Sequence, residues 1–278
     1  AGGVNFSDVY ADQTEINFSY FINKSDNLIL RNSVTQNLLG NVTTVFNNSQ
    51  NNTADRLNHR LNFMVDTKLD SLTSLRIQPN LSYTNNESVN SSTYTRDFGT
   101  YTTDGAQRLT NHNTSPAVSN NILLRKKFMR RGRTLSLNLN TNINNNDADN
   151  YNYNPETREK DNVKTKKIIN QLNDQESESI NQNTRLVYTE PLNKTLSIEF
   201  NYQNGYNHNT SERFTYDFNP ATLNYDLLND SLSNVYENTI LTNTAGFSFN
   251  KMAKKYNWNV GMAVQNTDRK NDNISRGF

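Results

Sequence analysis

The sequence predicts an all-β fold, an antiparallel transmembrane β-barrel with about ten strands, from three observations. Apolar side chains fall on every second residue over much of the chain, as in strands with one apolar and one polar face. These alternating stretches come in pairs that are joined by short turns. The connections between the pairs are long and polar, so short and long connections alternate along the chain.

The hairpins follow one another at a regular spacing. The stretch "RLVYTEPLNKTLSIEFNYQNGY" (185–206) has the clearest alternation, with Leu186 and Tyr188 before the turn and Ile198 and Phe200 after it. Turn centres lie about 60 residues apart, the signature of one supersecondary unit used repeatedly. The five turns are "ADQT" (11–14), "TKLDSLTS" (67–74), "MRRGR" (129–133), "EPLNK" (190–194) and "NKMAKKY" (250–256).

The long connections favour a membrane barrel over a soluble sandwich, which mixes short and long connections at both ends. Outer-membrane barrels have short periplasmic turns, long extracellular loops, a lipid-facing apolar side and a polar lumen. Strands with about ten alternating residues also match the span of about 9–11 that a bilayer requires. The expected long loops include the polar segments 47–56, 85–115, 144–167 and 207–238.

The composition suits a sheet with one wet face better than a soluble core. Hydrophobic residues make up 33% of the 278 residues, and the mean hydropathy is −0.87. Soluble domains contain roughly 45–50% apolar residues. Disorder is a poor explanation, because the formal net charge is only +1 and the chain holds 14 Tyr and 13 Phe.

Several classes of function and segment are disfavoured. The absence of cysteine removes disulfides, thiolate catalysis and cysteine zinc sites. The near-neutral charge gives no reason to expect nucleic acid as a partner. No apolar run approaches the roughly 18 residues that a membrane helix needs. The start, "AGGVNFSDVY", has neither the basic nor the apolar region of a signal peptide. We also expect no cofactor.

Two local features bear on the barrel. Tyr10, Phe128, Tyr188, Tyr256 and Trp258 lie near the short turns and are candidates for an aromatic girdle at one membrane interface. The alternative is that Tyr and Phe are simply good strand formers. Pro79 falls on the apolar stripe of a long strand, where it removes a ladder hydrogen bond, so we expect a bulge there.

Four stretches in combination resemble one known family, the outer-membrane β-barrel proteins of Bacteroidota that are related to TonB-dependent receptors. Each stretch alone is only a strand-and-turn pattern. They are "HRLNFMVDTKLDSLTSLRIQPNLSY" (59–83), "RRGRTLSLNLNTNIN" (130–144), "LVYTEPLNKTLSIEFNY" (186–202) and "TYDFNPATLNYDLLNDSLSNVYEN" (215–238).

The resemblance implies a barrel of about 22 strands in the cell outer membrane, with an N-terminal plug. It also implies uptake, in which long loops capture a solute, the lumen conducts it, and an inner-membrane TonB system moves the plug. Residues 1–278 would then be a single partial barrel domain without a plug. Because "DRKNDNISRG" (268–277) lacks alternation, we interpret Phe278 as a truncation point rather than as the terminal aromatic of a closing strand.

No residue is assigned to a catalytic, cofactor or metal site. His59, His112 and His208 are scattered, with no nucleophile and orienting group near them, so we expect no enzyme.

One loop is a weak calcium candidate. The segment "NNDADNYNYNPE" (145–156) places Asn145, Asp147, Asp149 and Glu156 at positions 1, 3, 5 and 12 of an EF-hand-like loop. Asn150 stands where glycine is expected and no helix flanks the loop, which favours chance spacing. Whether this loop binds calcium stays open.

Three surface segments have competing interpretations. The basic cluster "RKKFMRRGR" (125–133) is typical of cations that meet lipid phosphates, and nucleic acid is the less favoured partner. The acidic run "NDQESES" (173–179) is typical of a solvated loop. The aromatic-rich loop 213–238 could contact a ligand or could fold back and pack its own Tyr and Phe.

The sequence therefore predicts an outer-membrane barrel that takes part in solute uptake, with membrane lipid, an unidentified solute and a TonB system as partners. The first alternative is a barrel that merely anchors surface-binding or adhesion loops. An outer-membrane enzyme and a soluble secreted β protein are further alternatives.

Overall fold

The computed structural model describes residues 1–11, 13–39 and 42–275, and in this part the chain is an antiparallel sheet of eleven strands. The expected all-β antiparallel architecture is confirmed. No helix in the described residues is long and apolar enough to cross a membrane. Asp12 of the first turn and Phe278 lie outside the described residues. The strands are β1 (Gly2–Tyr10), β2 (Thr14–Leu39), β3 (Val42–Asp70), β4 (Thr73–Asp97), β5 (Thr102–Lys127), β6 (Thr134–Lys160), β7 (Val163–Pro191), β8 (Leu196–Asn219), β9 (Asn224–Leu228), β10 (Asn234–Met252) and β11 (Asn257–Asn273).

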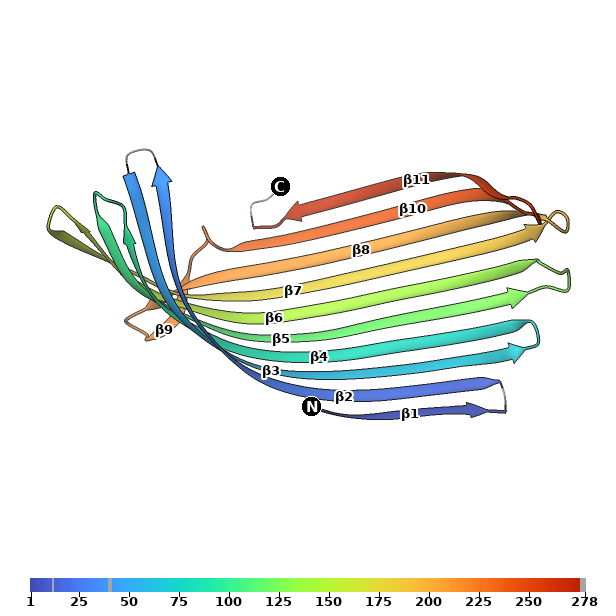
Figure 1. Cartoon of the computed structure of the whole chain (residues 1–278), viewed down its shortest axis with the longest axis horizontal. Helices are drawn as coiled ribbons and strands as arrows, with labels where there is room; N and C mark the ends of the chain where they lie inside the picture. The colour runs from blue at the N-terminus through green and yellow to red at the C-terminus, as the bar shows by residue number, and fades with distance from the viewer. Residues whose placement is uncertain (12, 40–41, 276–278) are drawn as a thin grey trace.

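Strand order in the sheet follows chain order from β1 to β8 and continues with β10 and β11, while the short β9 pairs back onto β8. Figure 1 shows the long strands side by side, with the tight turns of the predicted hairpins at one end. At the other end the β2–β3, β4–β5 and β6–β7 hairpins bend away from the rest of the sheet. Within the described residues, β1 and β11 are edge strands, each paired on one side only.

Cross-strand register sorts the side chains onto two faces. Apolar residues lie opposite apolar residues, for example Phe18 opposite Phe63, Ile77 opposite Ile122 and Phe247 opposite Met262. We call the face that carries these residues the outer face and the opposite one the inner face. Because side chains alternate with a period of two, the polar residues between them share the inner face.

The strands are far longer than a membrane requires. Seven of them, β2 to β8, have 24 to 29 residues, whereas a bilayer needs about 9–11. The segments 47–56, 85–115 and 144–167 were expected to be long loops. That prediction is wrong, because these segments are paired strands. They continue the ladder to tight turns such as Phe98–Tyr101, where the Phe98 N–H donates to the Tyr101 carbonyl at 3.0 Å.

The polar composition of these segments explains why they were mistaken for loops. Asn, Ser and Thr occupy both faces there, so the apolar alternation that signals a strand is missing. The backbone pairs nonetheless, and the β6–β7 hairpin closes at Asp161 and Asn162, whose φ values are 51° and 62°. Two successive residues with positive φ are what a two-residue type I′ turn requires.

An aromatic side chain stiffens the bent part of the sheet. Tyr94 is almost fully buried, and its ring lies over Gly105 so closely that a Cβ there would be 2.3 Å from a ring carbon. The Tyr94 hydroxyl donates to Asn154 at 3.0 Å and Glu156 at 3.1 Å, and the Arg96 guanidinium lies 4.6 Å from the ring centre. These contacts tie β4, β5 and β6 together close to the Phe98–Tyr101 turn, at the end of the sheet opposite the short turns.

Pro79 is accommodated without the expected bulge. The β3–β4 ladder is interrupted opposite Gln78 and Pro79 and resumes in the same register at Asn80. The register shift in this pair of strands lies instead between Lys68 and Asp70, beside the turn. A missing N–H is tolerated here because the same stretch of β4 stays paired to β5 on its other side.

The β3–β4 turn is organised by Asp70. Its carboxylate accepts hydrogen bonds from the Leu72 N–H at 2.7 Å and the Thr73 hydroxyl at 2.8 Å, and the Lys126 ammonium lies at 3.3 Å. The Thr73 hydroxyl and then the Leu72 N–H are the main causes that lower the pKa of Asp70 from 3.8 to about 2.

Adjacent residues of one strand should meet different solvents. Because the chain has no cysteine, Phe200→Cys on the outer face and Asn201→Cys on the inner face each create a unique thiol. In membranes, we expect a water-soluble maleimide to label Asn201→Cys and a lipid-soluble maleimide to label Phe200→Cys. Equal labelling of both thiols by the water-soluble reagent would contradict a lipid-facing outer face.

The Asp70 turn should lose its stabilising effect in acid. The pKa of Asp70 is lower in the folded state, so its contribution is present above about pH 4 and disappears as the pH falls towards 2. We expect Asp70→Asn to lower the urea midpoint of unfolding in detergent micelles at pH 7 and to match the unsubstituted chain near pH 2. A difference in midpoint that persists at pH 2 would show that the turn does not depend on the ionised carboxylate.

Candidate functional site

The outer face carries an apolar belt that no other part of the described chain covers. Phe200, Val260 and Val264 are 47%, 62% and 71% exposed, although large apolar side chains usually lie inside soluble domains. A contiguous exposed apolar face of this kind marks a contact with lipid or protein. The belt occupies the part of the strands nearest the short turns: Phe200 lies four residues from the turn-side end of β8, and Val260 lies three residues from that of β11. This is expected for a membrane span with short periplasmic turns.

Aromatic rings line the short-turn edge of the belt. Tyr10, Tyr256 and Trp258 are exposed there, and the Phe128 and Tyr188 rings meet edge to face with 6.5 Å between their centres. The predicted girdle residues therefore lie at one common level, where an amphipathic ring can rest between acyl chains and headgroups.

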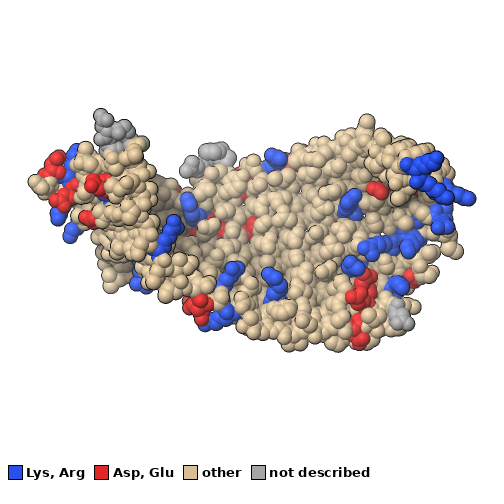
Figure 2. Space-filling view, viewed as in Figure 1, with Lys and Arg blue, Asp and Glu red and all other residues tan. Residues whose placement is uncertain are grey.

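Cations gather at the same end. Figure 2 shows Lys and Arg concentrated around the short turns. The basic cluster 125–133 lies there, and two of its arginines are partly neutralised, since Arg130 and Arg133 pair with Glu190 at 2.6 Å and 2.7 Å. This arrangement fits cations that flank a membrane span and meet lipid phosphates.

The inner face carries a row of amide and hydroxyl side chains across six strands. Register places these residues in one line, from β3 to β8: Asn62, Asn80, Ser119, Asn142, Asn181 and Asn207. Neighbours hydrogen-bond along the line: Asn62 donates to Ser19 at 3.0 Å, Asn80 donates to Ser119 at 3.4 Å, and Asn207 donates to Asn181. We call this line the amide row.

Two shallow cavities lie along the amide row. One, of about 470 Å³, includes Arg60, Asn80 and Asn142, and the other, of about 250 Å³, includes Asn142, Asn183 and Gly205. Among the described residues that line them, only Arg60 carries a charge. The amide row thus offers neutral donors and acceptors to a solute that passes it.

Gly205 forms the floor of the smaller cavity. A Cβ placed there would meet nothing closer than Thr242 at 3.9 Å, so the space above this glycine is open. A side chain at position 205 would fill the cavity without disturbing the backbone, which makes the position suitable for testing the wall.

The weak candidates from the sequence are not brought together. Segment 145–156 belongs to β6, so the calcium-loop interpretation is wrong: Asp147 and Asp149 lie on the outer face and Glu156 on the inner. In the described residues, no group of three His, Asp or Glu side chains is arranged to hold a metal. The acidic run 173–179 also lies in a strand, β7, rather than in a loop.

The histidines have separate partners. His59 shares a hydrogen bond with the Tyr20 hydroxyl at 2.7 Å, His112 lies 3.3 Å from Glu87, and His208 contacts the Thr239 hydroxyl at 3.0 Å. They belong to three different strands and form no common cluster.

The aromatic-rich segment 213–238 folds back, as one of its two interpretations predicted. Tyr225 of β9 packs edge to face against Tyr151 and Phe218, each with ring centres 5.4 Å apart, and its hydroxyl donates to Asn170 at 2.9 Å. Thr215 is fully buried and donates to Asn173 at 2.7 Å. Two of the aromatic rings that seemed available for a ligand, those of Phe218 and Tyr225, are therefore engaged within the sheet.

Sequence reasoning missed the amide row. Its members are ordinary polar residues between apolar ones, and only the register between strands reveals that they form a line. The signal present in the sequence was the repeated Asn at alternate positions in "LSLNLNTNINNN" (135–146).

Trp258, the single tryptophan, reports where the belt ends. It is 45% exposed on the outer face, opposite Lys251. In bilayers we expect its fluorescence to be quenched most by lipids brominated near the headgroup and little by aqueous iodide. Trp258→Phe should abolish the signal, and strong quenching by iodide would contradict a membrane-interface position.

Comparison with known proteins agrees with this geometry. A family model described as "Outer membrane protein beta-barrel family" matches residues 126–277. No curated protein matches the chain. Among solved structures, the crystal structure of Acinetobacter baumannii OccAB4 is 10% identical over 94% of this chain and 98% of that chain, but its TM-score of 0.12 supports no argument. Because the family model covers more than half of the 278 residues, the chain belongs to the outer membrane protein beta-barrel family and is located in the outer membrane.

Proposed function

We propose that this sheet is part of the wall of an outer-membrane uptake barrel of the TonB-dependent-receptor type found in Bacteroidota. The observation that carries the proposal is the amide row: a curved sheet with an apolar outer face carries a continuous line of neutral, hydrogen-bonding side chains on its inner face. Such a wall resembles the polar interior of outer-membrane barrels. The relation to TonB-dependent receptors rests on the resemblance of the hairpin sequences.

The chemistry of the wall suggests the class of solute. Amides and hydroxyls predominate in the lining of both inner cavities, which also includes Leu81, Val118 and Ile240, and Arg60 is the single charged residue. Asparagine side chains donate and accept hydrogen bonds at once and therefore suit hydroxyl-bearing solutes. We propose an uncharged, hydroxyl-rich solute.

The two edge strands support a larger barrel. Backbone groups that face lipid without partners cost several kcal/mol each, so open sheet edges do not persist in a membrane. β1 runs towards the short turns and β11 runs away from them, so an even number of further strands closes the sheet in antiparallel order. We propose that such strands complete the barrel and that a plug and a TonB system work within it.

A surface-binding or adhesion role is the second candidate. It is favoured by the paired hairpins that extend past the apolar belt, since they offer a large polar surface beyond the membrane. Catalysis forms no part of the proposal, because the histidines have separate structural partners.

Filling the Gly205 cavity tests the uptake proposal. In cells that carry the full chain, we expect Gly205→Leu to slow uptake of neutral trisaccharides about fivefold, the equivalent of roughly one lost hydrogen bond. The matched control, Ala245→Leu, adds the same side chain to the outer face opposite Tyr202 and should leave uptake unchanged.

The same cells separate the two candidate functions. Uptake that stops when the TonB system is depleted is the expected result. Surface binding without uptake, both before and after depletion of the TonB system, would favour the adhesion role. Equal uptake by the Gly205→Leu and Ala245→Leu variants would contradict passage along the amide row.

A further inference from the structure

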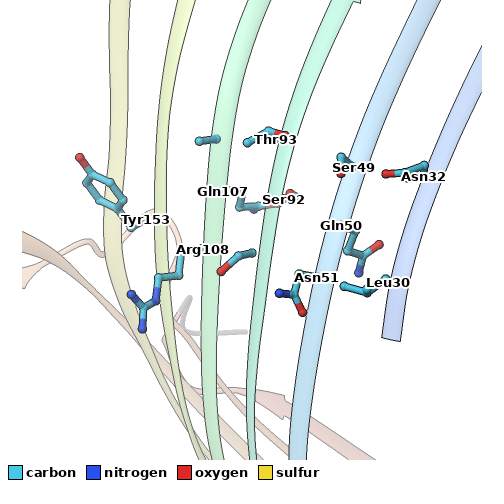
Figure 3. A pocket seen from close by; sticks show the side chains of 12 residues that line it. Leu30, Asn32, Ser49, Gln50, Asn51, Ser92, Thr93, Gln107, Arg108 and Tyr153 are labelled. Atoms are coloured by element: carbon cyan, nitrogen blue, oxygen red, sulfur yellow. The ribbon is translucent and has the colours of Figure 1, made fainter. Parts of the chain in front are cut away.

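A separate groove lies on the outer face, beyond the apolar belt. This outer groove has a volume of about 550 Å³ and is lined by Asn32, Ser49, Asn51, Thr93, Arg108 and Tyr153, among others. Figure 3 shows these side chains spread across β2 to β6, where the strands curve. No part of the amide row contributes to it.

Strand register fixes the side on which the groove opens. Thr93 lies twelve residues along β4 from Leu81, and Arg108 lies ten residues along β5 from Val118, with no register shift between them. Even separations keep a residue on the same face of a strand. Leu81 and Val118 lie opposite each other on the outer face, 43% and 41% exposed, at the end of the apolar belt away from the short turns. The outer groove therefore faces away from the lumen.

The groove holds one cation and no anion. Arg108 is the only charged residue among those that line it, and none of the described residues forms a hydrogen bond or ion pair with its guanidinium. Tyr153 is directly opposite Arg108 across the β5–β6 ladder and is 45% exposed. A guanidinium with free donors binds phosphate or carboxylate in a bidentate way.

Apart from Leu30 and Ala106, the remainder of the lining suits sugar rings. Amide and hydroxyl groups from Asn32, Ser49, Asn51 and Thr93 supply donors and acceptors along the groove, and the exposed Tyr153 ring offers a flat apolar surface. A chain of hydroxyl-bearing rings with an anionic group at the Arg108 end matches both features.

Charges nearer the belt position the anion. On the same face, register aligns Asp26, Asp55 and Glu87 across β2 to β4, closer to the belt than the groove. Lys24 lies 3.9 Å from Asp26 and His112 lies 3.3 Å from Glu87, but three carboxylates outnumber the single lysine. The row therefore repels an anionic group, whereas Arg108 attracts it. Together, these charges favour binding of the anionic group at the Arg108 end of the groove rather than on the surface between the groove and the belt.

The height of the groove identifies the source of the saccharide. Arg108 lies about 33 Å along the strand from Val118, at roughly 3.3 Å per residue, and a strand tilt of about 40° leaves roughly 25 Å above the belt. What surrounds an outer-membrane barrel at that level, outside its lumen, is the sugar portion of the outer-leaflet glycolipid. We propose that the outer groove binds the phosphorylated saccharide headgroup of an outer-leaflet glycolipid.

Binding by the purified full chain in detergent tests the chemistry. The probe is the deacylated, phosphorylated saccharide of the host's own glycolipid, compared with the same saccharide after phosphatase treatment. We expect Arg108→Gln to weaken binding of the phosphorylated probe about tenfold or more, since hydrogen bonds to charged groups are the strong ones. Tyr153→Leu should weaken binding of both probes.

Arg56→Gln is the matched control. It removes the same charge from β3, in the register position between Ser25 and Asn86 on the inner face. We expect this variant to bind like the unsubstituted chain. Equal binding by Arg108→Gln, or equal affinity for the dephosphorylated probe, would overturn the proposal.

Photo-crosslinking in cells distinguishes a membrane-borne saccharide from a free one. A photo-crosslinking amino acid in place of Tyr153 should capture glycolipid. Capture of a soluble polysaccharide alone would overturn the assignment to glycolipid. Uptake by Arg108→Gln cells should be unchanged, so failure of this proposal and failure of the uptake proposal are separate results.

Discussion

Backbone hydrogen bonding without help from water is the constraint on which this structure depends. A peptide group in hydrocarbon must find its partner within the protein. The sheet meets this requirement by pairing each of its long strands with its neighbours, in continuous registers of up to twenty-seven consecutive pairs between β6 and β7. Once the ladder is in place, alternation alone assigns each side chain to lipid or to the inner wall.

That division explains why so polar a chain needs no conventional core. Only Tyr94, Ala148 and two threonines among the described residues are buried, and Thr215 is the one that is fully enclosed. Lipid takes the place of a protein core on the outer face, and side-chain hydrogen bonds connect neighbouring strands on the inner face. The low hydrophobic content is therefore a direct result of the architecture.

The sequence was sufficient to predict the architecture, because the alternation of apolar residues, the short turns and the spacing of those turns are local patterns. It was insufficient for the polar hairpins, where both faces are polar and alternation carries no information. Asp161 and Asn162 are residue types that favour a turn. Without apolar stripes on either side, however, the segment around them had the composition of a loop. The amide row and the outer groove depend on which residues of different strands lie opposite one another, and one sequence does not specify that register. The Pro79 expectation failed because a paired neighbour on one side can replace a bulge.

The continuity of the strands past the belt has a consequence for the cell-surface side of the protein. Irregular loops expose unpaired backbone that proteases can bind in extended form, whereas a paired strand must first be peeled from its neighbour. Vulnerable peptide bonds are thereby confined to hairpin tips such as 98–101 and 161–162 and to the connection around β9. Those tips are also where evolution can insert or replace residues at little structural cost, so surface variation can accumulate there while the ladder beneath stays the same.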